Sequence, residues 1–204
     1  MSAPPEWIAV EHRVLGLDRR TFRPALVALV VALLLAYGWP ALDAALPWHN
    51  ETKPGDVLDL GDGATAVPPV GWQLESGTLA GAGSVSPTSV DVRLATGGAT
   101  ISLRGAPFTG SADAFLDQVL RSEGAQGVDG SRGTLTTAAG LVGVVQGATG
   151  PSGDQVVAAF KMAPGNGDTA PALLVTVRTA PGQFEHYQDS VGELLHGITP
   201  GAGR

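Results

Sequence analysis

An uncharged stretch near the N-terminus constrains the architecture of this chain more than any other feature. Residues 24–42 carry no charged side chain over 19 positions. An α-helix of that length spans about 28 Å, which is close to the ~30 Å hydrocarbon core of a bilayer. Aromatic rings, which favour the lipid–water boundary, follow at Tyr37, Trp39 and Trp48. We therefore predict a single transmembrane helix over residues 24–46 that contacts membrane lipid.

A cleaved signal peptide and a buried core helix both fit this stretch less well. A signal peptide has an apolar segment of only ~7–15 residues and a small-x-small cleavage site. If Ala44 occupies position −1 of the cleavage site, position −3 is Leu42; if Ala45 occupies position −1, position −3 is Asp43. Neither alternative gives the small residue that position −3 requires. A helix buried in a protein core would be amphipathic, whereas this one is apolar on every side. A retained anchor is the preferred interpretation.

The distribution of charge predicts how the anchor is oriented. Arg19, Arg20 and Arg23 directly precede the uncharged stretch, and the first basic residue after it is Lys53. Basic residues are enriched on the cytoplasmic side of a membrane, so we expect residues 1–23 to be cytoplasmic and the remainder to be extracytoplasmic. Residues 1–23 have a net charge of +1 and the remainder −8. A tail of this length cannot bury a core, so the activity is expected in the outer part.

The composition excludes several classes of protein. The chain of 204 residues has a formal net charge of −7 and a pI near 4.9, which argues against binding of nucleic acid through a basic face. It contains no cysteine, which excludes disulfide scaffolds, thiolate metal sites, thiol catalysis and a lipidated cysteine. The 29 glycines and 15 prolines indicate many turns and short elements.

The outer part alternates between short β-type segments and two amphipathic helical ones. Strands are expected at residues 57–60, 64–67, 72–79, 90–94, 99–104, 133–137, 141–149, 155–162 and 172–179. Helices are expected from Ser111 to Gly124 and from Pro181 to Ile198. Because the connections are of hairpin length, the sheet should be antiparallel. We predict an α+β domain over residues 56–198 with both helices on one face of the sheet, between a linker at 47–55 and a flexible tail at 199–204.

The order of these elements resembles that of the PsbP-like fold. The features that carry the resemblance are Gly71-Trp72 after a first hairpin, the helix start at residues 111–115 and the closing helix with Phe184, Tyr187 and Leu194. More narrowly, residues 56–198 resemble the actinobacterial cell-envelope branch, which includes the LpqN-type lipoproteins. Members of this fold are mostly non-enzymatic binding or assembly factors, which is what the resemblance implies here. The lipoproteins are tethered through a lipidated cysteine, which this chain lacks.

The histidines and the Gly-rich segments offer little chemistry. His12 is expected to be cytoplasmic, His49 lies near the membrane, and His186 and His196 lie ten residues apart on the last helix, which is a poor spacing for zinc. Both helix histidines are expected on its surface. The Gly-rich segments at residues 81–84 and 130–133 do not lead into an apolar helix, as a phosphate-binding loop would require.

Turn chemistry, chance and core packing account for the remaining motifs. Asp56, Asp59 and Asp62 form a cluster that departs from a calcium loop and suits a tight hairpin. Asn50-Glu51-Thr52 matches a glycosylation triplet that is common by chance. Trp72 is expected in the core or at a sheet edge, and Trp7 lies with Pro4-Pro5 in a solvated arm or a short docking segment. We expect no catalytic, cofactor-binding or metal-binding residues.

Two functions follow from these observations. The first is a membrane-tethered, extracytoplasmic accessory protein without enzymatic activity, an assembly or stabilising component of an envelope complex with a membrane or envelope protein as its partner. An exposed strand edge is a generic route to such a partner. The alternative is a small-molecule or lipid-binding module, or a hydrolase assembled from distant Ser, Asp and His186. An apolar pocket of ~300–1,000 Å³ would favour the alternative. A signalling receptor is disfavoured because residues 1–23 are too few for an output domain.

Overall fold

The computed structural model describes residues 13–14, 17–34, 50–83, 85–122, 130–150, 152–163 and 167–201. The chain divides into two units, Met1–His49 and Asn50–Arg204. In the first unit, β1 (Arg13–Val14) pairs with β2 (Leu17–Asp18), and α1 (Arg19–Leu33) follows directly. Among the described residues, no helix has both the length and the apolar character needed to cross a membrane. Residues 35–46 of the predicted span lie outside the described residues, as do His12, His49, Trp7 and Ser84.

The second unit is an α+β domain built on an antiparallel sheet of seven strands, ordered β5-β6-β7-β11-β10-β9-β8. The strands are β5 (Gln73–Ser76), β6 (Asp91–Thr96), β7 (Ala99–Ala106), β8 (Arg132–Thr136), β9 (Val142–Gly150), β10 (Gly153–Lys161) and β11 (Ala172–Thr179). The helix α3 (Ala112–Ser122) connects β7 to β8 at the far edge, and β11 returns to the middle of the sheet. The predicted antiparallel α+β architecture is confirmed.

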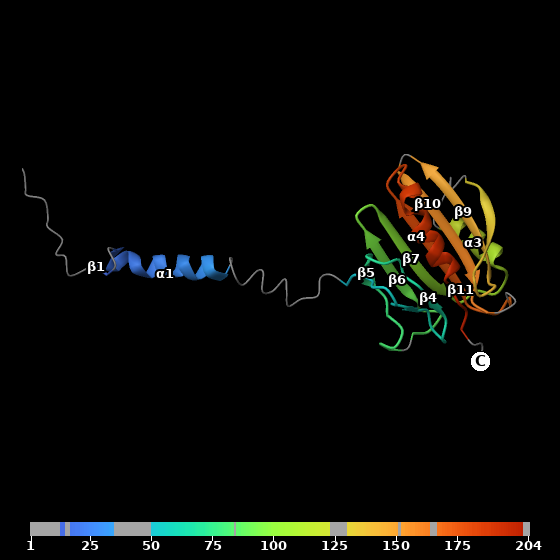
Figure 1. Ribbon diagram of the computed structural model, residues 1–204, viewed down its shortest axis with the longest axis horizontal. Helices are drawn as coiled ribbons and strands as arrows, with labels where there is room; N and C mark the ends of the chain where they lie inside the picture. Colours follow the sequence, from blue (N-terminus) through green and yellow to red (C-terminus); the bar gives the residue numbers. More distant parts are fainter. Residues whose placement is uncertain are drawn as a thin grey trace, which may run out of the picture. The chain divides into compact units, whose positions relative to one another are not determined.

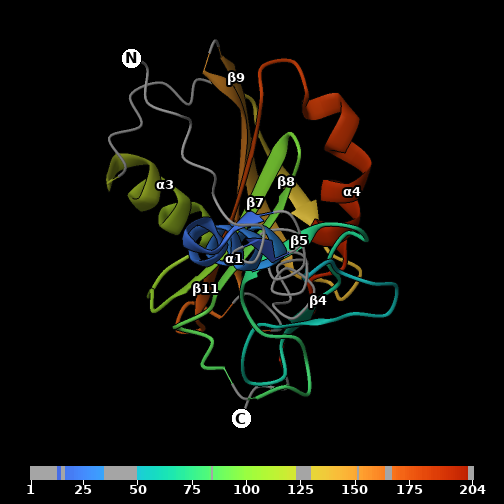
Figure 2. The same cartoon turned by 90° about the vertical axis from the view of Figure 1, so that its left-hand side faces the viewer.

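The two helices of the domain cover opposite faces of the sheet. The helix α4 (Phe184–His196) packs on the face that contains Ala158 and Phe160, whereas α3 packs on the face that contains Val157 and Ala159. Figures 1 and 2 show the sheet lying between the two helices. The prediction of both helices on one face is wrong, because the second half of β10 and the first half of β11 are buried on both sides. Every residue of β10 from Val157 to Lys161 is buried, as in a strand that is covered on both faces.

The larger core lies between the sheet and α4. Val191, Leu194 and Leu195 of α4 are buried against the inner side chains of β6, β7 and β11. Trp72 is 5% exposed, and its ring meets that of Tyr187 in an edge arrangement with the centroids 5.7 Å apart. This places Trp72 in the core, which is one of the two positions expected for it.

Close packing in this core uses a glycine as a partner for a large ring. Gly143 of β9 lies directly across from Phe160 of β10, which is fully buried. A Cβ atom at Gly143 would lie 2.3 Å from Cε1 of the Phe160 ring. The lack of a side chain at this position therefore makes the room for the ring and helps to fix the register of the two strands.

The smaller core lies between the sheet and α3. Phe115 and Leu116 of α3 pack with Val157, Ala159 and Leu174. The hydroxyl of Ser111 accepts the backbone N–H of Ala114 at 3.2 Å, which confirms the predicted N-terminal cap of this helix.

A small hairpin and both ends of the domain complete the fold. The hairpin consists of β3 (Leu58–Asp59) and β4 (Thr65–Ala66), and its turn has positive φ at Gly61, Asp62 and Gly63, as predicted. Thr199, which the sequence assigns to the flexible tail, forms a bridge with Thr65 of β4. Thr52, which it assigns to the linker, is 3% exposed and accepts the Trp72 N–H at 3.1 Å. The described parts of both segments therefore pack as part of the domain.

Candidate binding surface

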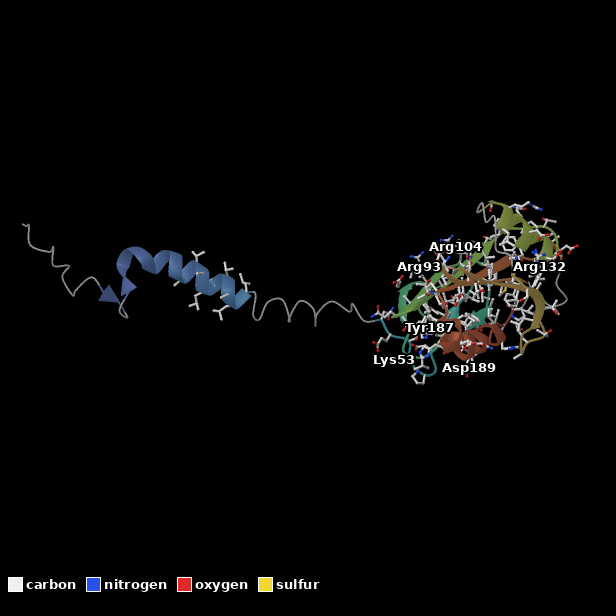
Figure 3. The ribbon with its side chains drawn as sticks, turned by 90° about the horizontal axis from the view of Figure 1, so that it is seen from above. Lys53, Arg93, Arg104, Arg132, Tyr187 and Asp189 are labelled. Carbon is white, nitrogen blue, oxygen red and sulfur yellow. The ribbon has the colours of Figure 1, made fainter. Side chains whose placement is uncertain are left out.

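Part of the face that carries α3 is left open by that helix. On this face α3 packs over β10, β9 and one end of β11. The alternation of side chains places the polar residues of β6, β7 and the other end of β11 beside it. We call this area the open face and define it by Arg93, Thr100, Ser102, Arg104, Leu174, Thr176 and Arg178. Figure 3 shows Arg93 and Arg104 on one side of the sheet and Tyr187 and Asp189 of α4 on the other.

The strand register determines how the open face is arranged. Ser102 of β7 lies at the centre of the open face. Its partner on the neighbouring strand β6 is Arg93, and its partner on the other neighbouring strand, β11, is Thr176. Two residues from Ser102 in one direction along β7, Arg104 pairs with Leu174 of β11. Two residues away in the other direction, Thr100 pairs with Arg178 of β11. All seven residues line one cavity of about 290 Å³. Three guanidinium groups and three hydroxyls therefore surround a shared space.

Two carboxylates flank this cavity without lining it. Glu75 Oε2 lies 3.9 Å from Nε of Arg93, and both side chains are about half exposed. Asp91 lies across from Arg104 in the strand register. An exposed ion pair at this distance contributes little. Residues 50–204 contain 8 basic and 15 acidic side chains, so the cavity concentrates positive charge on an acidic domain.

Arg132 shows how an arginine with a structural role differs from those of the open face. It donates from β8 to Asp113 at 2.9 Å and to Asp117 at 2.7 Å, both on α3, and to Gln146 of β9 at 3.1 Å. The hydrogen bond to the Asp117 carboxylate raises the pKa of Arg132 above its ordinary value. The positive charge of Arg132 is thus paired with two carboxylates of the same domain, and these contacts link β8 to α3.

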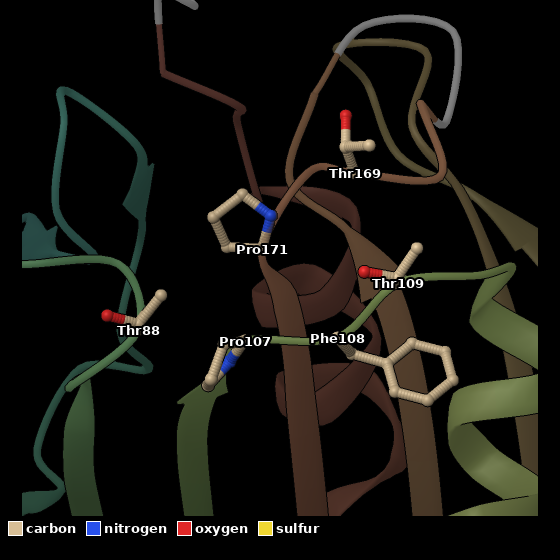
Figure 4. A pocket seen from close by; sticks show the side chains of 6 residues that line it. All are labelled: Thr88, Pro107, Phe108, Thr109, Thr169 and Pro171. Carbon is tan, nitrogen blue, oxygen red and sulfur yellow. The ribbon is translucent and has the colours of Figure 1, made fainter.

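A second cavity, of about 240 Å³, lies where three loops meet (Figure 4). Its lining carries no ionisable group and consists of Thr88, Pro107, Phe108, Thr109, Thr169 and Pro171. Nearby, the amine of Lys161 donates to the backbone carbonyls of Phe108 at 2.5 Å and Asp168 at 3.2 Å. Lys161 is fully buried, and desolvation lowers its pKa while Asp168 opposes this shift. These contacts connect two loops and leave the cavity with little chemistry of its own.

A third cavity, of about 290 Å³, is bounded partly by Asp59 and Asp91. The carboxylate of Asp59 already accepts the Gly61 N–H at 2.8 Å, and that of Asp56 accepts the Lys53 N–H at 2.7 Å. The aspartates singled out in the sequence thus shape turns, as expected. Within the described part of the chain, no group of three or more His, Asp or Glu side chains could hold a metal ion.

The histidines of the last helix do not form a site together. His186 and His196 are both exposed on α4, as predicted. The His186 ring packs edge-on against Tyr187, and Nδ1 of His196 lies 3.0 Å from the Thr136 carbonyl oxygen. Among the described residues, no serine or aspartate is hydrogen-bonded to His186, so the geometry of a hydrolase triad is not found there.

Sequence reasoning missed the arginines of the open face. Arg93, Arg104 and Arg178 each occupy an outward position of an alternating strand, and this pattern alone indicates a solvated face. The β6–β7 hairpin already places Arg93 near Arg104, and the pairing of β11 with β7 adds Arg178 from a distant part of the chain. No protein-family model matches the chain, and no curated protein matches it either.

Proposed function

We propose that this chain is a membrane-tethered, extracytoplasmic binding protein without enzymatic activity, an accessory component of a cell-envelope complex. In this proposal residues 24–46 span the membrane, residues 1–23 lie in the cytoplasm and a PsbP-like domain carries the function. The span rests on the uncharged stretch and on the arginines that precede it. It is supported by seven large apolar side chains between Leu26 and Leu34, each of which exposes about half of its surface.

The observation that carries the binding function is the open face itself. Arg104 and Arg178 make no ion pair with any described residue, and the pair of Arg93 is long. Unpaired charge gathered on a solvent-accessible surface is typical of a surface that meets a partner of opposite charge. The three cavities described above have volumes of about 240, 290 and 290 Å³, below the usual range for pockets that enclose a small molecule. Docking of a larger partner is therefore favoured over enclosure of a ligand.

Crosslinking in intact membranes tests this function. The full chain and a triple variant, R93Q/R104Q/R178Q, are crosslinked in cells, extracted with detergent and analysed by mass spectrometry. We expect a reproducible neighbour that the triple variant loses and that R121Q, which removes one charge from the exposed end of α3, retains. Recovery of the wild-type chain without a reproducible neighbour would contradict the proposal.

A further inference from the structure

We infer that the cavity of the open face binds a phosphate group, so that the partner of this domain is a phosphate-bearing component of the envelope. The location of the partner rests on the proposed function, whereas the chemistry of the site rests on the cavity alone. Its seven lining residues supply three guanidinium groups, three hydroxyls and one buried leucine, and no carboxylate.

The spacing of the arginines allows all three to reach one ligand. In a sheet with strands ~4.8 Å apart and a rise of ~3.4 Å per residue, the register places the Cα atom of Arg93 roughly 8 Å from that of Arg104 and roughly 12 Å from that of Arg178, and it places the Cα atoms of Arg104 and Arg178 roughly 14 Å apart. An extended arginine side chain crosses about half of the longest of these distances, so the three guanidinium groups can approach a common point between them. Their common cavity shows that the three side chains border the same space.

The donors around this space are available. Among the described residues, the hydroxyls of Thr100, Ser102 and Thr176 make no hydrogen bond, and Arg104 and Arg178 form no ion pair. An unoccupied guanidinium fork matches two oxygens of a phosphate, and Arg is favoured wherever phosphate is recognised in this way. A phosphate also offers further oxygens to the hydroxyls. A carboxylate has only two oxygens in one plane, so it would leave more of these donors unused.

The flanking carboxylates set a limit on the affinity. Glu75 competes for Arg93, and Asp91 lies across from Arg104. Both repel an incoming anion. This arrangement suits reversible binding, and it predicts that removing the charge of Glu75 strengthens binding, since Arg93 is released and one repulsive charge is lost.

Calorimetric titration of the full chain in a non-ionic detergent tests the inference. The probes are inorganic pyrophosphate, glycerol 3-phosphate and the short-chain lipid dihexanoylphosphatidylglycerol, each in metal-free buffer. We expect pyrophosphate to bind, each of R93Q, R104Q and R178Q to weaken binding about tenfold, and the triple variant to abolish it. R121Q should stay within about twofold of wild type, and E75Q should bind about twofold to threefold more tightly.

The other titrants identify the source of the phosphate. Tighter binding of pyrophosphate or glycerol 3-phosphate than of the lipid indicates a terminal phosphate, and the reverse order indicates a phosphodiester headgroup of the membrane. Circular dichroism melting verifies that each variant is folded. If the triple variant is unfolded, the binding affinities of the three single variants test the inference. Binding that the three arginine substitutions leave unchanged, or no binding of any probe by folded wild type, would overturn the inference. A wild-type chain that binds pyrophosphate but yields no reproducible crosslinked neighbour would refute only the proposed function.

Discussion

A single buried amine joins two loops at one end of the domain. Lys161 is the last residue of β10, is fully buried, and donates to carbonyls of the β7–α3 and β10–β11 loops. The Asp168 carbonyl also accepts the Gly110 N–H at 2.9 Å, and the Lys161 amine lies 5.5 Å from the centroid of the Phe108 ring. Three segments thus meet at one charge, which must be taken out of water to get there.

Replacing this amine should change both the stability and its dependence on pH. In K161M the Phe108 carbonyl loses its donor, and we expect the free energy of unfolding to fall by about 1–3 kcal/mol near neutral pH. Burial lowers the pKa of Lys161 in the folded state, so between this lowered pKa and the ordinary value of 10.5 the unfolded chain holds more protons. The stability of wild type should therefore rise with pH in that range, and K161M should lack this rise.

Urea unfolding at several values of pH measures both effects. K53M, which removes an exposed lysine, serves as the control and should stay within about 0.5 kcal/mol of wild type. The expectation fails if K161M is as stable as wild type and follows the same pH profile. The burial of Lys161 could not be predicted from the sequence, because a lysine at a strand end normally extends into solvent, and its two acceptors come from loops that only the folded chain brings together.

The helix α3 is connected to the edge strand β8 by an ion-pair network in addition to its apolar packing. The guanidinium group of Arg132, on the edge strand β8, forms ion pairs with the carboxylates of Asp113 and Asp117 on this helix. The three side chains are between about a third and about a half exposed, so the network adds little to global stability. Its contacts join the edge strand to the helix.

We expect R132Q to loosen α3 and β8 locally. Hydrogen exchange should become faster in residues 112–122 and 132–136 and remain unchanged in β10 and β11, while the free energy of unfolding changes by less than about 1 kcal/mol. Added salt should reduce the difference from wild type, because it screens exposed pairs. R93Q, whose own ion pair is long and lies on β6, is the matched control. Faster exchange throughout the sheet in R132Q would show instead that the network supports the whole fold.

At this scale the sequence predicted the elements better than their assembly. The hairpin of residues 90–104, the capped helix at Ser111 and the closing helix were all found near their predicted bounds. Each depends on local signals, such as alternation, a capping hydroxyl and an apolar helix face. The face on which each helix packs depends on which strands are neighbours. With β11 beside β10, the buried residues of these two strands form an apolar surface on each side of the sheet, and one helix packs on each of these surfaces.

For the molecule as a whole, the predicted tether depends on local sequence signals, whereas the open face depends on which strands are neighbours in the folded sheet. The tether is a contiguous property of residues 24–46, so composition and charge are enough to propose it. The open face joins the β6–β7 hairpin to β11, which lies far away in the chain, so its cavity has no signature in any one segment. The proposed tether and the proposed site consequently need independent tests.

The orientation of the tether is the remaining prediction, and it follows from the three arginines ahead of the uncharged stretch. With the full chain fused at its C-terminus to alkaline phosphatase, which is active only outside the cytoplasm, we expect high activity in a bacterial host. A fluorescent protein fused at the same C-terminus should not fluoresce when it lies outside the cytoplasm. In the variant R19Q/R20Q/R23Q/D43K/N50K the basic charge moves behind the span, and the enzyme activity should fall several-fold as molecules insert the other way.

The control for orientation is R13Q, which removes one charge farther from the span and should leave most of the activity. Salt washing of the membranes separates a spanning chain from one held at the surface by charge, since only surface attachment is screened. Wild-type chain released by salt, or a C-terminal fluorescent protein that is bright inside the cell, would contradict the tether. Pyrophosphate binding by the open face is a separate prediction, because the residues that define this face all belong to the unit Asn50–Arg204.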